Sequence, residues 1–353
     1  MTRAQLKSLA MIVATGLVLL ASPALAKPKW ALVIHGGAGV IERKDLTPEV
    51  EAAYRKAMAD AAAKGSKVLA EGGAAMDAVE AVIRDLEDDP LFNAGRGAVF
   101  TAEGRNELDA AVMDGRTLRA GSVAGVTRTR HPITLARAVM EKSRHVMMIG
   151  AGADAFAASQ GLEQVDPSFF FTERRWQGLV RELTAQGLPV PARPAGAPAP
   201  QAAVHGLPDD SDRKFGTVGV VALDSRGDLA AGTSTGGMTA KRWGRVGDAP
   251  VIGAGTYASN QSCAVSATGS GEYFIRLTVA REVCALVQYE GVPLQQAADT
   301  VIQDRLTAIG GDGGVIAIAP DGQIAWSFNT PGMYRARAAD GEPTVVSIFK
   351  DEQ

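Results

Sequence analysis

The sequence predicts an α+β fold in which strands and helices are grouped into layers. Helical patterns follow one another up to about residue 186, and strands dominate from residue 217 onwards, with two helices among them. Strict alternation of strand and helix, which would indicate a doubly wound parallel sheet, is not seen. The 40 glycines point to tight turns and close backbone approaches. The chain of 353 residues suffices for one large domain or two small ones.

Residues 1–26 are predicted to be a secretory signal peptide rather than part of the fold. A short basic start is followed by an apolar run at 9–21 and by Ala24-Leu25-Ala26, which supplies the small residues that a signal peptidase reads. The run is short for a membrane span, although a retained N-terminal anchor is the alternative. We therefore expect a periplasmic or secreted protein, with no membrane association once the signal is removed.

Composition excludes several classes of function. The net charge of −3 gives no sign of a nucleic-acid partner or of an anionic membrane surface. The phosphate-binding motif G-x-x-x-x-G-K-[ST] does not occur. Four scattered histidines and two separated cysteines argue against a catalytic zinc site.

Helix signals in the first half are strongest at two places. Thr47 is placed to cap a helix that begins at Pro48, with two glutamates in its first turn. Apolar residues at helical spacing from Val79 predict a second helix that stops near Asp89-Pro90. The other elements expected before residue 187 are a buried strand at 30–34, short strands up to about residue 126, and helices at about 133–142, 152–160 and 169–186.

A proline-rich segment divides the chain. Five prolines between residues 189 and 200 alternate with alanine and glycine, and a polar run at 209–212 closes the stretch. This composition cannot pack as a core, so residues 187–213 are predicted to be a flexible linker. Regular structure resumes at Thr217. The elements expected beyond it are strands at 218–223, 229–235, 315–319, 324–328 and 344–349, and helices at about 272–289 and 293–306.

Cys263 and Cys284 leave two interpretations open. An oxidising compartment would permit a disulfide between them. Cys263 lies in a strand-like run and Cys284 in a helix-like one, both among apolar neighbours. We therefore favour two buried thiols.

Two glycine-rich motifs suggest functions that the rest of the sequence does not support. Residues 232–236 match the G-x-S-x-G elbow of serine hydrolases, yet all four histidines precede Ser234, whereas that fold needs one after it. Residues 150–155 match the G-x-G-x-x-A of dinucleotide-binding loops, but the acidic residue expected about 20 positions later has no good candidate. We interpret the second motif as a tight strand-to-helix turn.

A predicted hairpin places two threonines opposite each other. If its turn centres on Arg226, Thr217 and Thr235 are equidistant from the turn and about 5 Å apart at Cβ. Such pairs are ordinary in sheets, but Thr217 also follows Gly216 directly at the end of the linker. Cleavage between Gly216 and Thr217 would free an α-amine with a pKa of about 7.7–8.0, which can take the threonine's own hydroxyl proton. Nucleophile and base would then belong to one residue.

Two further segments have the composition of a binding site. Residues 268–271, Thr-Gly-Ser-Gly, precede the helix expected near Glu272, where free amides can hold an oxyanion or a carboxylate, although a plain helix cap has the same sequence. Arg245 and Asp248 lie in one glycine-flanked loop. They form either a structural ion pair or a clamp for a zwitterion, with Arg245 on a carboxylate and Asp248 on an ammonium.

Together these motifs resemble the plant-type (type 2) asparaginases, or isoaspartyl peptidases, of the N-terminal-nucleophile hydrolase superfamily. The resemblance covers nearly all of the chain after the signal peptide. It rests on seven motifs in the family's order, at residues 35–39, 90–95, 107–110, 216–219, 233–239, 244–248 and 268–271.

The resemblance implies a role for each matching residue. Thr217 would be the nucleophile in both self-cleavage after Gly216 and catalysis, Thr235 would hold its hydroxyl, and Thr268 with Gly269 would form the oxyanion hole. Arg245 would bind the substrate α-carboxylate, and Asp248 with the Gly271 carbonyl would bind the α-amine. The implied substrate-binding positions are Asn93, Arg245, Val246, Gly247, Asp248, Thr268, Gly269, Ser270 and Gly271.

The resemblance also implies an architecture and an assembly. A four-layer αββα sandwich would be formed jointly by an α subunit (27–216) and a β subunit (217–353), and two such heterodimers would associate. Catalysis would need no cofactor. A structural sodium ion would be held by the backbone carbonyls of Leu86, Glu87, Asp89, Phe92, Ala94 and Arg96.

The function so implied is hydrolysis of L-asparagine and of β-aspartyl dipeptides with release of L-aspartate. A glycosylasparaginase, which has the same nucleophile, is the nearest alternative, and the Gly-Thr-Val-Gly context of residues 216–219 argues against it. An exported amino-acid-binding protein is the alternative from another class. Such a protein would have no reason to be cleaved after Gly216.

Overall fold

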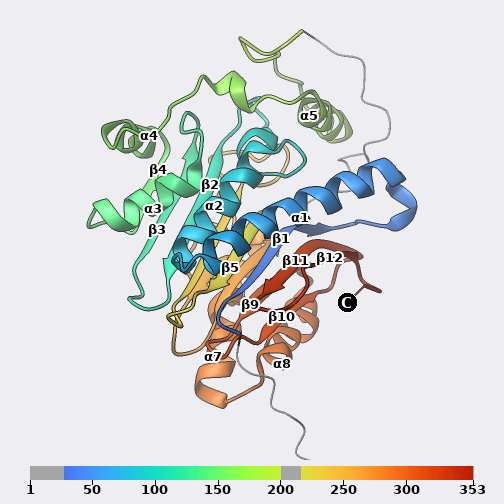
Figure 1. Ribbon diagram of the computed structural model, residues 1–353. Helices are drawn as coiled ribbons and strands as arrows, with labels where there is room; N and C mark the ends of the chain where they lie inside the picture. Colours follow the sequence, from blue (N-terminus) through green and yellow to red (C-terminus); the bar gives the residue numbers. More distant parts are fainter. Residues whose placement is uncertain (1–27, 200–215, 353) are drawn as a thin grey trace, which may run out of the picture.

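Two β-sheets form the centre of the molecule (Figure 1). The computed structural model describes residues 28–199 and 216–352, so the predicted signal peptide and most of the predicted linker lie outside the description. The larger sheet has eight strands in the order β12-β11-β1-β5-β6-β2-β3-β4, and the smaller has four in the order β10-β9-β8-β7. The strands are β1 (Ala31–Gly39), β2 (Leu108–Asp114), β3 (Ala120–Val126), β4 (Met147–Ile149), β5 (Val218–Leu223), β6 (Leu229–Thr235), β7 (Thr256–Ala258), β8 (Ala264–Gly269), β9 (Gly313–Ile318), β10 (Ile324–Phe328), β11 (Gly332–Ala339) and β12 (Val345–Phe349).

Helices cover the outer face of each sheet. On the larger sheet lie α1 (Pro48–Ala70), α2 (Ala75–Asp88) and α3 (Pro132–Lys142), and on the smaller lie α6 (Gly271–Leu277), α7 (Val279–Glu290) and α8 (Leu294–Asp299). Two more helices, α4 (Gly150–Ser159) and α5 (Glu173–Ala185), lie at the periphery of the larger sheet (Figure 1). The predicted four-layer αββα sandwich is confirmed.

Three apolar clusters hold the four layers together. One joins α1–α3 to the larger sheet, one lies between the two sheets, and one joins the smaller sheet to α6–α8. Strand β1 is buried on both faces, because it contributes to both the first and the second cluster. This explains why its sequence lacks the polar alternation of a half-exposed strand.

The predicted helix ends agree with the structure where local chemistry defines them. The Thr47 side chain accepts a hydrogen bond from Val50 N at 3.4 Å, and α1 begins at Pro48 as expected. Helix α2 ends at Asp88, two residues before Pro90. Its first turn is capped from outside, since Ala75 N donates to Asp224 Oδ2 in the turn between β5 and β6.

Several elements of the C-terminal half differ from their predictions, among them β7, for which no strand was expected. The helix expected at 272–289 is broken at Thr278, which has a φ of +49° between α6 and α7. The helix expected at 293–306 continues from α8 into a π-helix, Thr300–Leu306. Strand β11 was not predicted, because its polar and apolar residues do not read as a buried strand.

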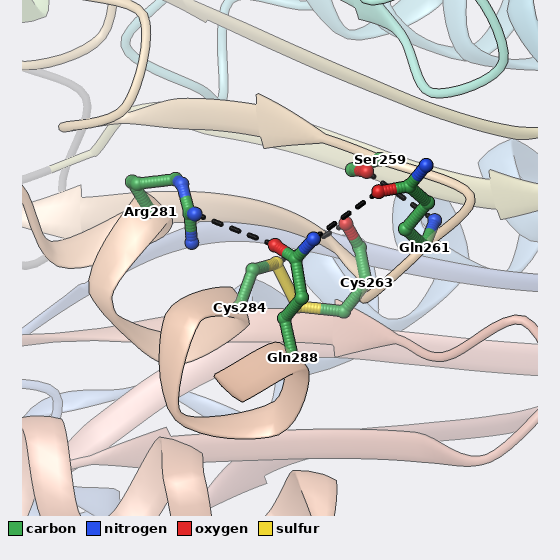
Figure 2. The surroundings of a disulfide bond; sticks show 6 residues. All are labelled: Ser259, Gln261, Cys263, Arg281, Cys284 and Gln288. Atoms are coloured by element: carbon green, nitrogen blue, oxygen red, sulfur yellow. Dashed lines mark hydrogen bonds between the residues drawn. A yellow bond between two sulfur atoms is a disulfide. The ribbon is translucent and has the colours of Figure 1, made fainter. Parts of the chain in front are cut away.

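Cys263 and Cys284 form a disulfide, so the prediction of two buried thiols is wrong (Figure 2). Cys263 precedes β8 and Cys284 lies in α7, and the fold brings their Cα atoms to 5.3 Å. Beside the bond, Gln288 joins Arg281 on the same helix to Gln261 in the loop before β8. The disulfide thus fastens a helix of the outer layer to the strand beneath it.

The described start of the predicted linker, residues 188–199, is anchored to the body. It contains neither helix nor strand, as its prolines predict. Arg193 pairs with Glu173 of α5, donates to Pro198 O and lies 4.5 Å from the centre of the Phe171 ring. Within the described residues, every helix is too short or too polar to span a bilayer.

Candidate active site

The hairpin of β5 and β6 places the two predicted threonines side by side. Val218 pairs with Ser234, which sets Thr217 opposite Thr235. Thr217 Oγ1 donates to Thr235 Oγ1 at 3.0 Å, and Thr235 Oγ1 also accepts from Gly237 N at 3.0 Å. Both threonines are buried, so the nucleophile candidate is held in one orientation and shielded from bulk water.

The chain is continuous through Gly216 and Thr217, so the structure represents the uncut protein. Gly216 is enclosed by the C-terminal end of β1 and by the loop that follows α2. A Cβ at Gly37, whose φ is +109°, would lie 2.6 Å from Gly216 Cα, and a Cβ at Gly216 itself would lie 2.8 Å from Asn93 Cβ. Asn93 N donates to Gly216 O at 3.1 Å. The carbonyl that Thr217 would attack is therefore already polarised by an amide.

Asn93 also connects this junction to the end of β6. Its side-chain amide donates to Gly237 O at 2.7 Å, while its side-chain oxygen accepts from Val99 N at 3.0 Å. Because Gly237 N donates to Thr235 Oγ1, Asn93 braces both sides of the threonine pair. The resemblance counts Asn93 among the substrate-binding positions, and that role stays a prediction.

Thr268 and Gly269 end β8, beside the C-terminal end of β1. Thr268 Oγ1 accepts a hydrogen bond from Ala38 N at 3.3 Å, and Ala38 follows the glycine that touches Gly216. A side chain at Gly269 would clash with Asp312 O and Phe274. The next residue, Ser270, is hydrogen-bonded to Asp312 through both its backbone and its side chain.

The predicted clamp residues meet at the start of α6. A Cβ at Gly271 would lie 2.9 Å from Arg245 Nη2 and 3.0 Å from Asp248 Oδ1, so both side chains converge on that glycine. Arg245 pairs with Glu272 through two hydrogen bonds of 2.9 Å. Arg245 is thus occupied by a carboxylate that a substrate carboxylate could replace. The structural Arg245–Asp248 pair, the alternative interpretation, is not the one that forms.

Asp248 has the electrostatics of an ammonium-binding group. It is 5% exposed, and its Oδ2 atom has no hydrogen-bond partner. Burial raises its pKa to about 7, against the opposing effect of Arg245. A positive ligand would remove the penalty of keeping this buried carboxylate charged. Val246 and Gly247 carry the chain between the two clamp residues, and a Cβ at Gly247 would lie 2.9 Å from Arg245 Nη1.

Sequence reasoning missed two buried polar groups beside the site. Lys241 Nζ lies 3.8 Å from Asp109 Oδ2 and donates to Glu107 O at 2.9 Å. Asp109 pairs directly with Thr235 across β2 and β6, so this buried ion pair lies next to the threonines. Burial raises the pKa of Asp109, and Lys241 opposes the rise. The motif at 107–110 gave a signal for Asp109, whereas nothing in the sequence singled out Lys241.

The second missed group is the imidazole of His35 with the hydroxyls around it. His35 lies in β1 within the motif at 35–39, and its two ring nitrogens contact Thr217 O and Ser266 Oγ at 3.0 and 2.9 Å. Burial lowers its pKa to about 3, so the ring is neutral. The sequence gives no signal for this role, because neither partner of the ring lies near His35 in the chain.

The loop predicted to hold sodium follows α2. A Cβ at Gly95 would lie 2.2 Å from Glu87 O, and one at Gly97 would lie 1.9 Å from Phe92 O, so these carbonyls turn towards the glycines. The Leu86 carbonyl has no helical partner, because residue 90 is a proline without an N–H.

The Glu87 carboxyl is not a candidate ligand, since it accepts from Ser234 and Ile133 and burial raises its pKa to about 8. Backbone oxygens of this kind suit a hard cation. The described residues contain no group of three or more acidic, histidine or cysteine side chains that could hold a metal ion.

Fold and site together define the class of protein. Two sheets sandwiched between helices, with a threonine directly before a central strand, are the arrangement of the N-terminal-nucleophile hydrolases. The buried hydroxyl pair, the polarised Gly216 carbonyl and the adjacent zwitterion clamp are consistent with an amide-hydrolysing member.

Comparison with known proteins narrows this class to one family. Residues 28–348 match the family model described as asparaginase. The chain is 48% identical over 323 residues to the isoaspartyl peptidase of Salmonella typhimurium, covering 92% of this chain and 99% of that protein. It is 48% identical to the isoaspartyl peptidase of Escherichia coli (92% and 97%) and 39% identical to the plant-type L-asparaginase of Pyrococcus abyssi (88% and 97%). The chain belongs to the asparaginase family.

Proposed function

We propose that this protein is an autocleaving amidohydrolase that releases L-aspartate from L-asparagine and from β-aspartyl dipeptides. The single observation that carries the proposal is the Thr217–Thr235 hydroxyl pair directly after Gly216. The names and high identity of the relatives support the substrate class. The zwitterion clamp supports it independently, since both substrates carry an α-carboxylate and an α-ammonium on one carbon.

Maturation would begin with attack of Thr217 Oγ1 on the Gly216 carbonyl carbon. The amide of Asn93, which donates to Gly216 O, would stabilise the negative charge that develops on that oxygen. The acyl group passes from the threonine nitrogen to its oxygen, and water hydrolyses the resulting ester. The products are a chain ending at Gly216 and a chain beginning at Thr217 with a free amine.

Catalysis would use the new amine as general base. The amine takes the Oγ1 proton as Oγ1 attacks the side-chain carbonyl of the substrate, and it returns that proton to the departing ammonia or peptide amine. Thr268 and Gly269 would stabilise the oxyanion, while Arg245 and Asp248 would hold the α-carboxylate and the α-ammonium. Water then hydrolyses the β-aspartyl ester by the same proton path and regenerates Thr217.

The test is substitution of the nucleophile. Thr217→Ala should remain one chain on a denaturing gel and hydrolyse neither L-asparagine nor isoaspartyl-leucine, because no hydroxyl remains to attack. Thr217→Ser keeps the hydroxyl and should still be cleaved. Intact mass and N-terminal sequencing measure cleavage, and ammonia or leucine release measures turnover. Two chains, or turnover, in Thr217→Ala would contradict the proposal.

We further propose that the loop at 86–96 holds a structural sodium ion through its backbone carbonyls. The glycines at 95 and 97, which leave room for these oxygens, support this assignment. The ion would brace the loop that carries Asn93 and would take no part in the reaction.

Export and assembly complete the proposal. The signal at 1–26 would direct the protein to the periplasm or out of the cell, and the disulfide supports an oxidising destination. The active form would be a dimer of cleaved α–β heterodimers, as the family resemblance implies.

A further inference from the structure

The imidazole of His35 connects the nucleophile to the interior of the sandwich. It is fully buried, and its Nδ1 atom lies 3.0 Å from the carbonyl oxygen of Thr217. Its Nε2 atom lies 2.9 Å from Ser266 Oγ on β8. The ring thus joins the first residue of the future chain end to the other sheet.

The hydrogen-bond directions follow from the chemistry of the partners. A carbonyl oxygen only accepts, so Nδ1 carries the proton and donates to Thr217 O. Because the buried ring is neutral, Nε2 must accept, and Ser266 Oγ donates to it. Ser266 Oγ lies 2.7 Å from Thr233 Oγ1, which in turn accepts from Thr256 Oγ1 at 2.7 Å. The Thr217 carbonyl therefore requires the Nδ1–H tautomer, and the Ser266 hydroxyl can donate to the other ring nitrogen.

The glycine at position 219 shows that the chain makes room for this contact. A Cβ at Gly219 would lie 1.9 Å from Ser266 Oγ and 2.3 Å from His35 Nε2. Any side chain there would displace the imidazole or the serine. The second glycine of the Gly-Thr-Val-Gly motif is thus explained by His35 rather than by the cleavage itself.

Cleavage changes what holds Thr217. Before the cut, the peptide bond to Gly216 fixes its nitrogen. Afterwards Thr217 keeps its peptide bond to Val218 of β5, and its carbonyl and hydroxyl are its remaining points of attachment. Thr235 holds the hydroxyl at 3.0 Å and His35 holds the carbonyl. Two attachment points fix rotation about the Cα–C bond, and so they fix where the amine lies.

We propose that His35 is a positioning residue, whose hydrogen bond to the Thr217 carbonyl keeps the free α-amine in the geometry that removes the Oγ1 proton. This inference rests on the proposed function, in which Thr217 is the nucleophile. The hydrogen bonds of His35 also reach the rest of the site. Ser266 lies two residues before Thr268 on β8, and Thr233 lies two residues before Thr235 on β6.

Two substitutions at His35 separate positioning from packing. In His35→Asn the side-chain amide can occupy the place of Nδ1 and still donate to Thr217 O. In His35→Gln the amide reaches the place of Nε2 instead, and Thr217 O loses its donor. We expect kcat for L-asparagine to fall about 10- to 100-fold in His35→Gln, with KM within about threefold of the parent, because misplacing a reacting group by about 1 Å has this effect. His35→Asn should recover most of kcat.

Ser266→Ala removes one hydroxyl without altering the fold, and it serves as the second variant. It should lower kcat less than His35→Gln does, since the donor to the Thr217 carbonyl remains and only the hydrogen bond to Nε2 is lost. His131→Gln is the matched control, because His131 is also buried and bonded, to Asp88 at 3.1 Å, on the α3 side of the larger sheet. That control should keep the parent's kcat even if its thermal midpoint falls.

The outcomes distinguish this inference from the proposed function. A parent protein that is neither cleaved nor active refutes the proposed function. If the parent and His131→Gln are active, and His35→Gln and Ser266→Ala have the same kcat as they do, only the positioning role is refuted. Equal losses in His35→Asn and His35→Gln that follow the thermal midpoint also refute it, because they indicate packing. A folded and fully cleaved His35→Gln with lowered kcat, beside a His35→Asn that keeps most of kcat, supports it, since the α-amine acts only after the cut.

Discussion

Asp248 is a buried carboxyl that must be charged to bind an ammonium group. Its pKa of about 7, raised by burial, lies in the range where the enzyme would work. Below that pH the free protein holds Asp248 protonated, and the clamp lacks its negative side. Affinity for a zwitterion should therefore depend on pH through this one group, because only the ionised fraction is competent.

The competitive inhibition constant of L-aspartate measures this dependence without chemistry. We expect it to rise about tenfold when the pH falls from 8 to 6, since the ionised fraction of a group with a pKa of about 7 falls by nearly that factor. Asp248→Asn should bind L-aspartate more weakly and lose this dependence. An equal slope in both proteins would rule Asp248 out as the ammonium ligand.

Stability should change with pH in the opposite sense. The pKa of Asp248 is higher in the folded protein than in the unfolded chain, so the folded state binds the proton more tightly. The stability gained from the protonated carboxyl is full below about pH 4 and is lost as the pH rises through about 7. The thermal midpoint of Asp248→Asn relative to the parent should accordingly be higher at pH 8 than at pH 5.

At the scale of residues, the sequence predicted those site members that local patterns reveal. Thr217 and Thr235 follow from their equal distance to the hairpin turn at Arg226, and Asp248 from a glycine-flanked loop. His35 and Ser266 are 231 positions apart and meet only because β1 and β8 face each other across the sandwich. A histidine or a serine in an apolar strand gives no local sign of such a partner.

The disulfide acts at the scale of one helix and one strand. It closes a loop of 21 residues between the start of β8 and α7. Fixing a loop of this length in the unfolded chain stabilises the folded state by about 3 kcal/mol. Cys263→Ala with Cys284→Ala should thus lower the thermal midpoint by several degrees, and a reductant should have the same effect on the parent. Self-cleavage should be unchanged, and an unshifted midpoint would mean that the bond adds no stability.

Other elements escaped prediction because tertiary contacts define them. The helix expected at 272–289 breaks at Thr278 because Ala280 N and Arg281 N donate to the carbonyls of Ala254 and Gly253 rather than to the preceding turn. Strand β11 is buried despite Arg335, whose guanidinium donates to the carbonyls of Met333 and Phe349. A sequence pattern registers the charge of Arg335 but not the carbonyls that accept from it.

At the scale of the whole molecule, the layer architecture followed from the grouping of elements and from the family resemblance, but the strand order did not. The predicted α subunit contributes β1, β2, β3 and β4 to the larger sheet, and the β subunit contributes the others. In that sheet β1 lies between β11 and β5, while β6 pairs with β2. The two products of the proposed cleavage would thus be interleaved along three pairs of neighbouring strands.

Interleaving predicts how the cleaved protein behaves. Cutting the bond before Thr217 removes no strand pairing, so both chains should elute together from a sizing column and separate only in denaturant. The unfolding midpoint of the cleaved protein should rise with protein concentration, because its unfolding releases two chains. Uncut Thr217→Ala unfolds as one chain, so its midpoint should lack this contribution. Any association of two αβ units contributes to the midpoint of both proteins. The difference between them therefore measures the effect of the cut alone. Two separate peaks without denaturant would contradict the strand order, since neither chain could leave without breaking the hydrogen bonds of β1 on both of its edges.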